Sequence, residues 1–310
     1  MKILIAGGAG FLGSHLSERL LREGHDITVV DNLNTGKKDN IKHLFSYAKF
    51  SYLSADIQYI GVPNFVKTFD RIYNLACPAS PPHYQLNPIY TMLTCVNGTN
   101  NLLKIAKWHG ARFLQASTSE VYGDPEIHPQ TEEYLGNVSC IGIRSCYDEG
   151  KRAAESLCFD YKRMHDIEIR VARIFNTYGP NMRPDDGRVV SNFICQALRG
   201  EPITIYGDGT QTRSFCYVDD MVSGLIAMME SNLTLANIGN PDEYEVRDMA
   251  EIIVKMCNST SEVVFMPLPY DDPTKRKPDI FRMESIGWKP TTKLEQGLRQ
   301  TINYFKGILK

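Results

Sequence analysis

Short apolar runs alternate with longer amphipathic stretches through the first half of the chain. The run Lys2–Ala6 has the character of a buried strand. Similar runs follow at 26–30, 50–53, 71–75, 112–116 and 167–174. Between them, apolar residues recur at helical spacing, most clearly over 89–109 and 147–165. This alternation predicts an α/β fold in which a parallel sheet is covered by helices.

The pattern changes near residue 176. Segment 176–188 is rich in Pro, Gly, Asn and Asp and predicts a long loop, and 267–278 is a charged segment interrupted by prolines. Further elements are expected as a strand at 203–206 and helices at 190–199, 219–230, 248–257 and 293–305. We therefore expect two domains. Residues 1–175, with a contribution from about 214–239, form a Rossmann-type doubly wound domain, and 176–310 form a smaller, partly interleaved α/β substrate domain.

Composition excludes several classes of protein. The 310 residues include 34 basic and 36 acidic ones, for a net charge of −2, which argues against a broad surface for nucleic acid. No apolar run approaches the roughly 20 residues of a membrane span. The eight cysteines form no C-x-x-C pair and the histidines show no metal-ligand spacing. We expect a cytoplasmic protein with reduced thiols, no metal site and no contact with membrane.

A glycine-rich turn between the first strand and the first helix predicts a dinucleotide site. Gly7, Gly10 and Gly13 have the spacing G-x-x-G-x-x-G, and Phe11 and Leu12 begin the helix whose N-terminus would face the pyrophosphate.

The end of the second strand predicts which dinucleotide binds. The carboxylate of Asp31 can accept the adenosine ribose hydroxyls and would repel a 2′-phosphate, which favours NAD over NADP. The alternative is that Asp31 only starts a turn with Asn32 and Asn34. The cofactor site is also expected to include Asn32, Asp56, Ile57 and Leu75.

Tyr147 and Lys151 stand four residues apart on one face of a predicted helix. A nearby ammonium favours the phenolate and so makes the phenol a better base near neutral pH. Many helices contain such a pair by chance. Here it follows a dinucleotide motif and the segment 117–123, Ser-Thr-Ser-Glu-Val-Tyr-Gly, at a strand end.

With these motifs the chain resembles the extended short-chain dehydrogenase/reductases that act on nucleotide sugars, over essentially its whole length. The resemblance implies that Thr118 hydrogen-bonds the sugar hydroxyl, that Tyr147 takes its proton and that Lys151 holds the cofactor ribose. It also implies a homodimer formed by the two long helices. One departure is Cys95, where many members have an asparagine.

Within that family, the chain is most similar to members that decarboxylate UDP-glucuronate to UDP-xylose. The matching stretches are 74–82, 118–125, 144–151, 186–193 and 271–280. Arg276 would address the substrate carboxylate, and Glu120 would help to orient the ring. The pair Ser119-Glu120 lacks the second carboxylate of a dehydratase. The alternatives are a UDP-sugar 4-epimerase, a nucleotide-sugar 4,6-dehydratase, and a non-catalytic sensor on the same fold.

The resemblance also suggests which residues hold UDP-glucuronate. Asn176 and Arg213 would meet the diphosphate, and Tyr206 the uridine. The other predicted substrate residues are Pro81, Tyr84, Arg188 and Gln211. Each of these could instead be an ordinary turn residue.

Overall fold

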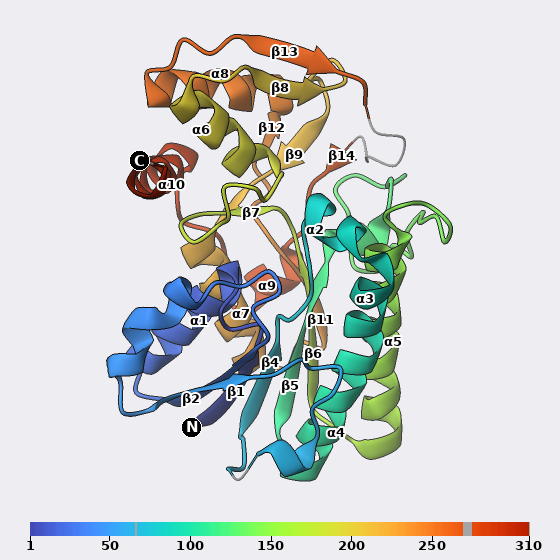
Figure 1. Cartoon of the computed structure of the whole chain (residues 1–310). Coiled ribbons are helices and arrows are strands. Elements are labelled where there is room, and N and C mark those ends of the chain that lie inside the picture. The colour runs from blue at the N-terminus through green and yellow to red at the C-terminus, as the bar shows by residue number, and fades with distance from the viewer. Residues whose placement is uncertain (66, 269–274, 310) are drawn as a thin grey trace.

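The computed structural model describes residues 1–65, 67–268 and 275–309. Figure 1 shows a large part built around one twisted sheet, with a smaller part above it.

Seven parallel strands form the main sheet of the described chain, in the order β11-β6-β5-β4-β1-β2-β3. Their bounds are Lys2–Ala6 (β1), Asp26–Asp31 (β2), Phe50–Ser54 (β3), Arg71–Asn74 (β4), Arg112–Thr118 (β5), Ile169–Ile174 (β6) and Leu235–Ile238 (β11). The strand order reverses between β1 and β4, and doubly wound folds bind their ligands at the carboxyl ends of the strands beside such a reversal. The predicted parallel, doubly wound sheet is confirmed.

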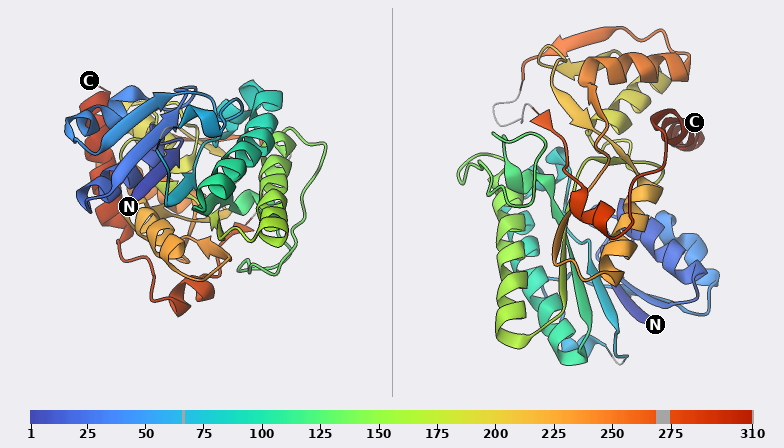
Figure 2. Two further views of the ribbon diagram at one scale, coloured as in Figure 1. Left: turned by 90° about the horizontal axis from the view of Figure 1, so that it is seen from below. Right: turned by 180° about the vertical axis from the view of Figure 1, so that it is seen from behind.

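Strand β1 shows why both faces of this sheet must be covered. Ile3 and Ile5 belong to one apolar core, and Leu4 and Ala6, which point the other way, belong to a second. Seen from below in Figure 2, the strands lie between helices on two sides. One side carries α1 (Phe11–Arg22), the 3-10 helix η1 (Lys38–Ser46) and α7 (Val218–Glu230). The other carries α3 (Pro88–Leu93), the π-helical turn η3 (Thr94–Gly98), α4 (Thr99–His109) and α5 (Ser145–His165).

The smaller part is made of short strands and three longer helices. Its helices are α6 (Val189–Arg199), α8 (Val246–Cys257) and α10 (Leu294–Ile308). Its strands are β8 (Ile203–Tyr206), β9 (Thr212–Ser214), β12 (Glu243–Glu245), β13 (Val263–Met266) and β14 (Lys275–Arg276), paired as β12-β9-β14 and β13-β8. The remaining short elements are η2 (Val62–Asn64), α2 (Pro81–Leu86), η4 (Ser119–Tyr122), β7 (Thr177–Tyr178), β10 (Cys216–Tyr217) and α9 (Phe281–Ser285).

The chain passes between the two parts more than once. After β6 it builds α6, β8 and β9, and it then returns to the large part, where α7 covers the sheet and β11 pairs with β6. The domain boundary near residue 175 stays a prediction.

Two details differ from the predicted elements. The helix expected over 89–109 is divided into α3, the π-helical turn η3 and α4. The loop expected over 176–188 contains the two-residue strand β7, which pairs with β10. Strands of two or three residues carry too few positions to show a hydrophobic period, so the pattern did not predict β9, β12 or β14.

Candidate active site

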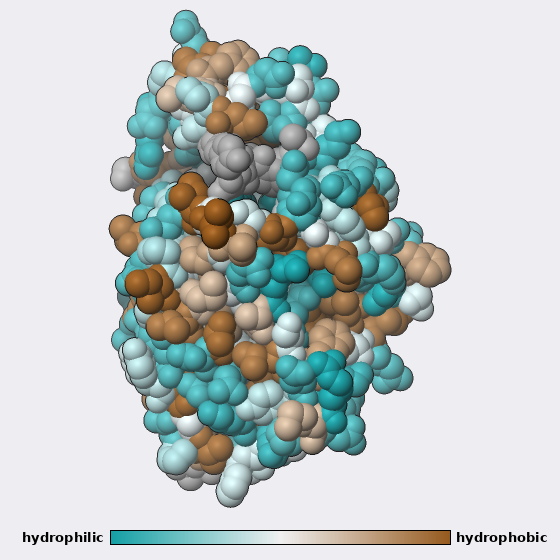
Figure 3. Space-filling view, turned by 90° about the vertical axis from the view of Figure 1, so that its right-hand side faces the viewer, coloured by the Kyte–Doolittle hydropathy of each residue, from teal (hydrophilic) through white to brown (hydrophobic). Residues whose placement is uncertain are grey.

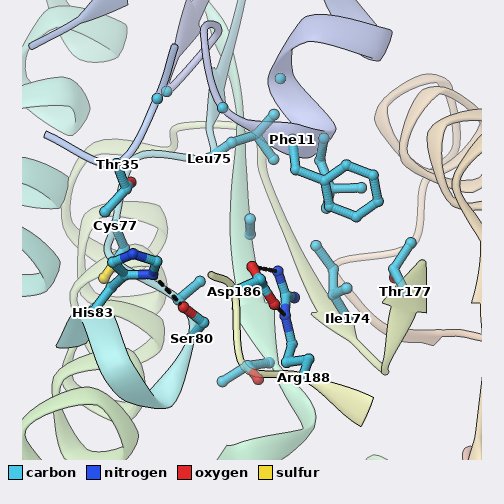
Figure 4. Close-up of a pocket in the computed structure, with 18 of the residues that line it drawn as sticks. Phe11, Thr35, Leu75, Cys77, Ser80, His83, Ile174, Thr177, Asp186 and Arg188 are labelled. Carbon is cyan, nitrogen blue, oxygen red and sulfur yellow. Dashed lines mark hydrogen bonds and ion pairs between the residues drawn. The ribbon is translucent and has the colours of Figure 1, made fainter. Parts of the chain in front are cut away.

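A cavity lies at the carboxyl ends of the central strands and extends toward the smaller part (Figure 4). The predicted site residues that line it are Gly7, Gly10, Phe11, Leu12, Gly13, Asp31, Leu75, Thr118, Glu120, Tyr147, Lys151, Asn176 and Arg188. Residues from both halves of the chain therefore meet in one site.

The glycine turn is as tight as the sequence suggests. Gly7 has a φ of +77°, and a Cβ there would lie 2.7 Å from the backbone carbon of Leu75. A Cβ on Gly13 would lie 2.1 Å from the carbonyl oxygen of Gly7, so any side chain would force the turn apart. The turn leads into α1, whose N-terminal N–H groups favour an anion. This geometry fits the pyrophosphate of a dinucleotide.

Asp31 ends β2 at the rim of the same cavity. Its carboxylate accepts hydrogen bonds from the backbone N–H groups of Ala9 (3.0 Å) and Leu33 (2.8 Å). Burial raises the pKa of Asp31, and these two hydrogen bonds oppose the rise. The carboxylate is thus held in place where an adenosine ribose would lie, which fits NAD.

Three other predicted cofactor residues do not line this cavity in the described chain. The Asn32 amide donates to Asp56 (2.9 Å) and to the Tyr90 hydroxyl (2.7 Å), and that hydroxyl donates to Asp56 (2.6 Å). Ile57 is buried and packs where a Cβ of Gly98 would be. These residues support the β2 and β3 ends beside Asp31.

Thr118, Tyr147 and Lys151 come together because β5 and α5 are packed on one another. Thr118 is the last residue of β5, and Tyr147 lies in the first turn of α5. One turn later, the Lys151 ammonium donates to the Ala116 carbonyl (2.8 Å) and lies 5.6 Å from the centre of the Tyr147 ring. Burial raises the pKa of Tyr147 well above its ordinary value, and hydrogen bonding with Thr118 acts in the opposite direction. In the protein alone the phenol is therefore protonated at neutral pH.

A second cluster centres on the Glu120 carboxylate. Arg276 binds it with both terminal nitrogens, at 2.5 Å and 2.7 Å, and Arg144 binds it at 2.5 Å. Burial by itself would raise the pKa of Glu120, but the two guanidinium groups outweigh it and lower that pKa to about 2. Glu120 is therefore a fixed negative charge beside Tyr147 at any physiological pH.

Arg276 reaches Glu120 from 156 residues away in the sequence. It lies in β14, which pairs with β9 so that Arg276 stands opposite Arg213. Its Nε is buried and has no hydrogen-bond partner in the described residues. The preceding residues 271–274, which belong to the stretch used for the family resemblance, lie outside the described residues.

The predicted substrate residues occupy several places. Arg188 is paired with Asp186 at 2.5 Å and 2.8 Å on the cavity wall (Figure 4). Tyr84, in α2 with Pro81, stacks on Tyr147 with ring centres 5.1 Å apart.

The remaining substrate residues lie in the smaller part. Tyr206 is exposed at the end of β8, and its carbonyl accepts from the Gln211 amide at 2.5 Å. Arg213 is buried in β9, where one terminal nitrogen donates to the Thr212 carbonyl at 2.9 Å. These three residues do not line the cavity in the described chain.

Several residues of the site were not predicted. Arg144 stands at the start of α5, where the helix dipole disfavours a cation. An arginine at such a position indicates that an acidic partner is near. The Ser80 Oγ and the His83 Nδ1 lie 2.6 Å apart on the cavity wall, and Cys77 lies beside these two residues (Figure 4). Nothing in the local sequence distinguishes these three.

Two negative findings apply to the described residues. They contain no group of three or more His, Cys, Asp or Glu side chains placed to hold a metal ion. None of their helices combines the length and the apolar character that crossing a bilayer requires.

Fold and site together define a class: a dinucleotide-binding protein with a Tyr-Lys pair and a charged subsite next to it. The chain belongs to the NAD dependent epimerase/dehydratase family, whose model matches residues 3–240. This confirms both the predicted resemblance and NAD as the cofactor.

The individual relatives are more specific. UDP-glucuronic acid decarboxylase 1 of Xenopus tropicalis is 52% identical over 100% of this chain and 73% of its own length. UDP-glucuronic acid decarboxylase 3 of Arabidopsis thaliana is 56% identical over 96% of this chain and 87% of its own. Among solved structures, UDP-glucuronic acid 4-epimerase from Bacillus cereus, in complex with UDP-glucuronic acid and NAD, matches with a TM-score of 0.91. It is 29% identical over 99% of this chain and 100% of that one.

Proposed function

We propose that the protein is an NAD-dependent UDP-glucuronate decarboxylase that forms UDP-xylose and CO2. The observation that carries this proposal is the Glu120 carboxylate held between Arg276 and Arg144 beside Thr118, Tyr147 and Lys151. Glu120 lines the cavity, and the two guanidinium groups that bind it support a cationic subsite for an acidic sugar next to a site for hydroxyl oxidation. The identity of 51–56% to curated decarboxylases supports the same substrate.

Loss of CO2 from the sugar requires an electron acceptor next to the carboxylate. NAD, which the glycine turn and Asp31 would hold, would supply a hydride acceptor for C4 of the sugar and a hydride donor for the later reduction at C4. Tyr147 takes the proton of the C4 hydroxyl, and the Lys151 ammonium favours the phenolate that this requires. The product of this step is a β-keto acid, whose C4 carbonyl takes up the electrons when CO2 leaves. Thr118 and protonated Tyr147 then stabilise the enolate oxygen.

Glu120 moderates how strongly Arg276 holds the substrate. Both terminal nitrogens of Arg276 already bind Glu120, so a substrate carboxylate has to share this guanidinium or use its Nε, which has no hydrogen-bond partner among the described residues. An unshared arginine would stabilise the carboxylate in the ground state and so oppose its departure. Arg144 keeps Glu120 in place during the exchange. The subsite thus positions the acid group without over-stabilising it.

The proposed activity is tested by product identification. The purified protein is incubated with UDP-glucuronate without added reductant, and the products are identified by mass spectrometry and NMR. We expect CO2 and UDP-xylose. UDP-galacturonate instead would show a 4-epimerase. In a parallel incubation with a nucleotide-linked hexose that has a free 6-hydroxyl, loss of water would show a 4,6-dehydratase.

We further propose that the protein is a homodimer formed through the face that contains α3 and α5 (Figure 3). Exposed apolar side chains on or next to these helices are Leu86, Ile89, Leu93, Ile141, Ile143 and Met164. Burying such residues against a second copy is favourable. The cytoplasmic location stays a prediction that cell fractionation can test.

Light scattering tests the dimer, which would have twice the chain mass of 35.1 kDa. Ile89→Asp should give a monomer. Phe265→Asp, which changes an exposed apolar residue of β13, should not. A monomeric wild-type protein, or a dimer broken only by Phe265→Asp, would contradict this interface.

A further inference from the structure

Two cysteine sulfurs meet beside the cavity. Cys77 lies between β4 and α2 and lines the cavity, where Figure 4 shows it next to His83. Cys95 lies in the π-helical turn η3 and is buried. Their Sγ atoms are 3.3 Å apart although 18 residues separate them in the sequence. Both are free thiols that belong to no C-x-x-C motif.

The pair joins two walls of the active site. A Cβ on Gly150 would lie 3.0 Å from the Cβ of Cys95 and 3.2 Å from its Sγ, so Cys95 packs directly on α5. Gly150 immediately precedes Lys151 in that helix. On the other side, Cys77 belongs to the segment that follows β4 and includes the cavity residue Leu75. The pair therefore lies between the segment after β4 and helix α5, and both of these contribute residues to the cavity.

The surroundings of the two thiols shift their pKa values in opposite directions. Hydrogen bonding with Cys77 has the largest effect and lowers the pKa of Cys95, burial opposes the lowering, and the Lys151 ammonium adds to it. Burial raises the pKa of Cys77. The first thiolate of the pair thus forms on Cys95, and it can accept the Cys77 proton across the 3.3 Å contact.

We propose that Cys77 and Cys95 are an oxidisable dithiol, a modification site for small peroxides, and that their disulfide stops turnover. The proposal stands on the contact between the two sulfurs, the position of Cys77 on the cavity wall and the packing of Cys95 on α5.

The oxidation balances with one molecule of hydrogen peroxide. Cys77 meets the peroxide in the cavity and attacks one oxygen while its proton passes to the Cys95 thiolate. The O–O bond breaks, Cys77 becomes a sulfenic acid, and the departing hydroxide takes a proton from solvent to form water. The Cys95 sulfur then attacks Cys77, the S–OH bond breaks, and the thiol proton leaves with the hydroxide as a second water. Two thiols lose two electrons, and the peroxide gains them.

Disulfide formation has to change the site. An S–S bond is about 2.0 Å long, so the sulfurs must come about 1.3 Å closer than they are. Either Cys77 is drawn off the cavity wall or Cys95 leaves its contact with Gly150. A displacement of this size near reacting groups lowers turnover by about 10- to 100-fold.

The experiment treats the reduced holoenzyme with hydrogen peroxide, removes the peroxide, and divides the sample. Peptide mapping under non-reducing conditions should find the Cys77 and Cys95 peptides joined, with the mass of two hydrogen atoms lost. UDP-glucuronate turnover should fall by about 10-fold or more and should return after treatment with dithiothreitol. The turnover arm rests on the proposed function, whereas the mapping arm does not.

Matched variants separate this pair from the other thiols. Cys95→Ser should keep its turnover through the peroxide treatment, while Cys140→Ser, which removes an exposed thiol, should lose it as the wild type does. Should Cys95→Ser fail to fold, peptide mapping of the wild-type protein still shows whether Cys77 and Cys95 form a disulfide. Unlinked peptides, a disulfide to Cys146, or a Cys77–Cys95 disulfide with full turnover would each overturn the proposal.

Discussion

Glu120 and Asp148 are two carboxyl groups of one cluster, yet their surroundings move their pKa values in opposite directions. Two arginines hold the pKa of Glu120 at about 2. Burial, and then the negative charge of Glu120, raise the pKa of Asp148 to about 8. One buried oxygen of Asp148 has no hydrogen-bond partner in the described residues. At the scale of the residue, contacts and burial set the charge, and the residue type alone does not.

The protonated state of Asp148 predicts a dependence of stability on pH. In the unfolded chain this carboxyl ionises near its ordinary pKa of 3.8, and in the folded protein near 8. Between these values the folded state binds one more proton, so the free energy of unfolding falls as pH rises. Asp148→Asn has no carboxyl group to ionise and so avoids this loss. The difference in free energy of unfolding between variant and wild type should therefore shift in favour of the variant by roughly 1 kcal/mol or more from about pH 5 to about pH 8.

Urea unfolding of wild type and variant at the two pH values measures this difference. Asp160→Asn on the same helix changes an exposed carboxylate paired with Arg163 and should show no comparable dependence on pH. Equal effects of Asp148→Asn at both pH values would mean that the native carboxyl is ionised.

Removing the phenol of Tyr147 should stop the chemistry and leave the fold intact. Tyr147→Phe loses the group that takes the C4 hydroxyl proton, so we expect kcat to fall about 100- to 10,000-fold with little change in UDP-glucuronate affinity. Steady-state kinetics and calorimetric binding measure the two quantities.

Tyr161→Phe is the matched control for that change. It removes a hydroxyl from the same helix, one that donates to Asn100 away from the cavity. Its kcat should stay near that of the wild type. A Tyr147→Phe protein with full turnover would show that another group takes the proton.

At the level of single elements, the short glycine-rich sequence between β1 and α1 determines a turn that can bind the cofactor. Its glycines are required by close backbone contacts, most severely at Gly13. Helix α5 determines the opposite wall of the site. It carries both Tyr147 and Lys151, and Cys95 packs against it at Gly150. Both elements follow from local sequence, and both were predicted from it.

A methyl group at Gly13 should remove the cofactor. In Gly13→Ala the new Cβ meets the Gly7 carbonyl, and relief of that overlap opens the turn, at a cost of about 1 to 3 kcal/mol in stability. We expect purified Gly13→Ala to contain much less NAD than the wild type, measured by absorbance after acid release.

Gly307→Ala is the control, because a Cβ there would meet nothing within 4 Å in the last turn of α10. Alanine is the better helix former, so this variant should keep its NAD and its stability. Unchanged NAD content in Gly13→Ala would show that the turn does not bind the pyrophosphate.

At the scale of the whole molecule, the site depends on contacts that join distant parts of the chain. A short stretch of sequence was enough to predict three features: the parallel sheet, the glycine turn and the Tyr147-Lys151 pair. The ion pair of Glu120 with Arg276 was not predicted, because it depends on β14 pairing with β9 in the smaller part. The contact of Cys77 with Cys95 likewise exists only once η3 and the segment after β4 are packed together. Local periodicity carries no information about such placement.

In the proposed reaction C4 is oxidised only transiently, and the bond to the carboxylate carbon breaks while C4 is a ketone. Turnover of UDP-glucuronate in D2O tests it most directly, with deuterium located in the product by NMR. We expect UDP-xylose with one deuterium at C5, where a deuteron from the solvent replaces CO2, and with the original hydrogen at C4. Deuterium at C4, or a product without deuterium at C5, would contradict it.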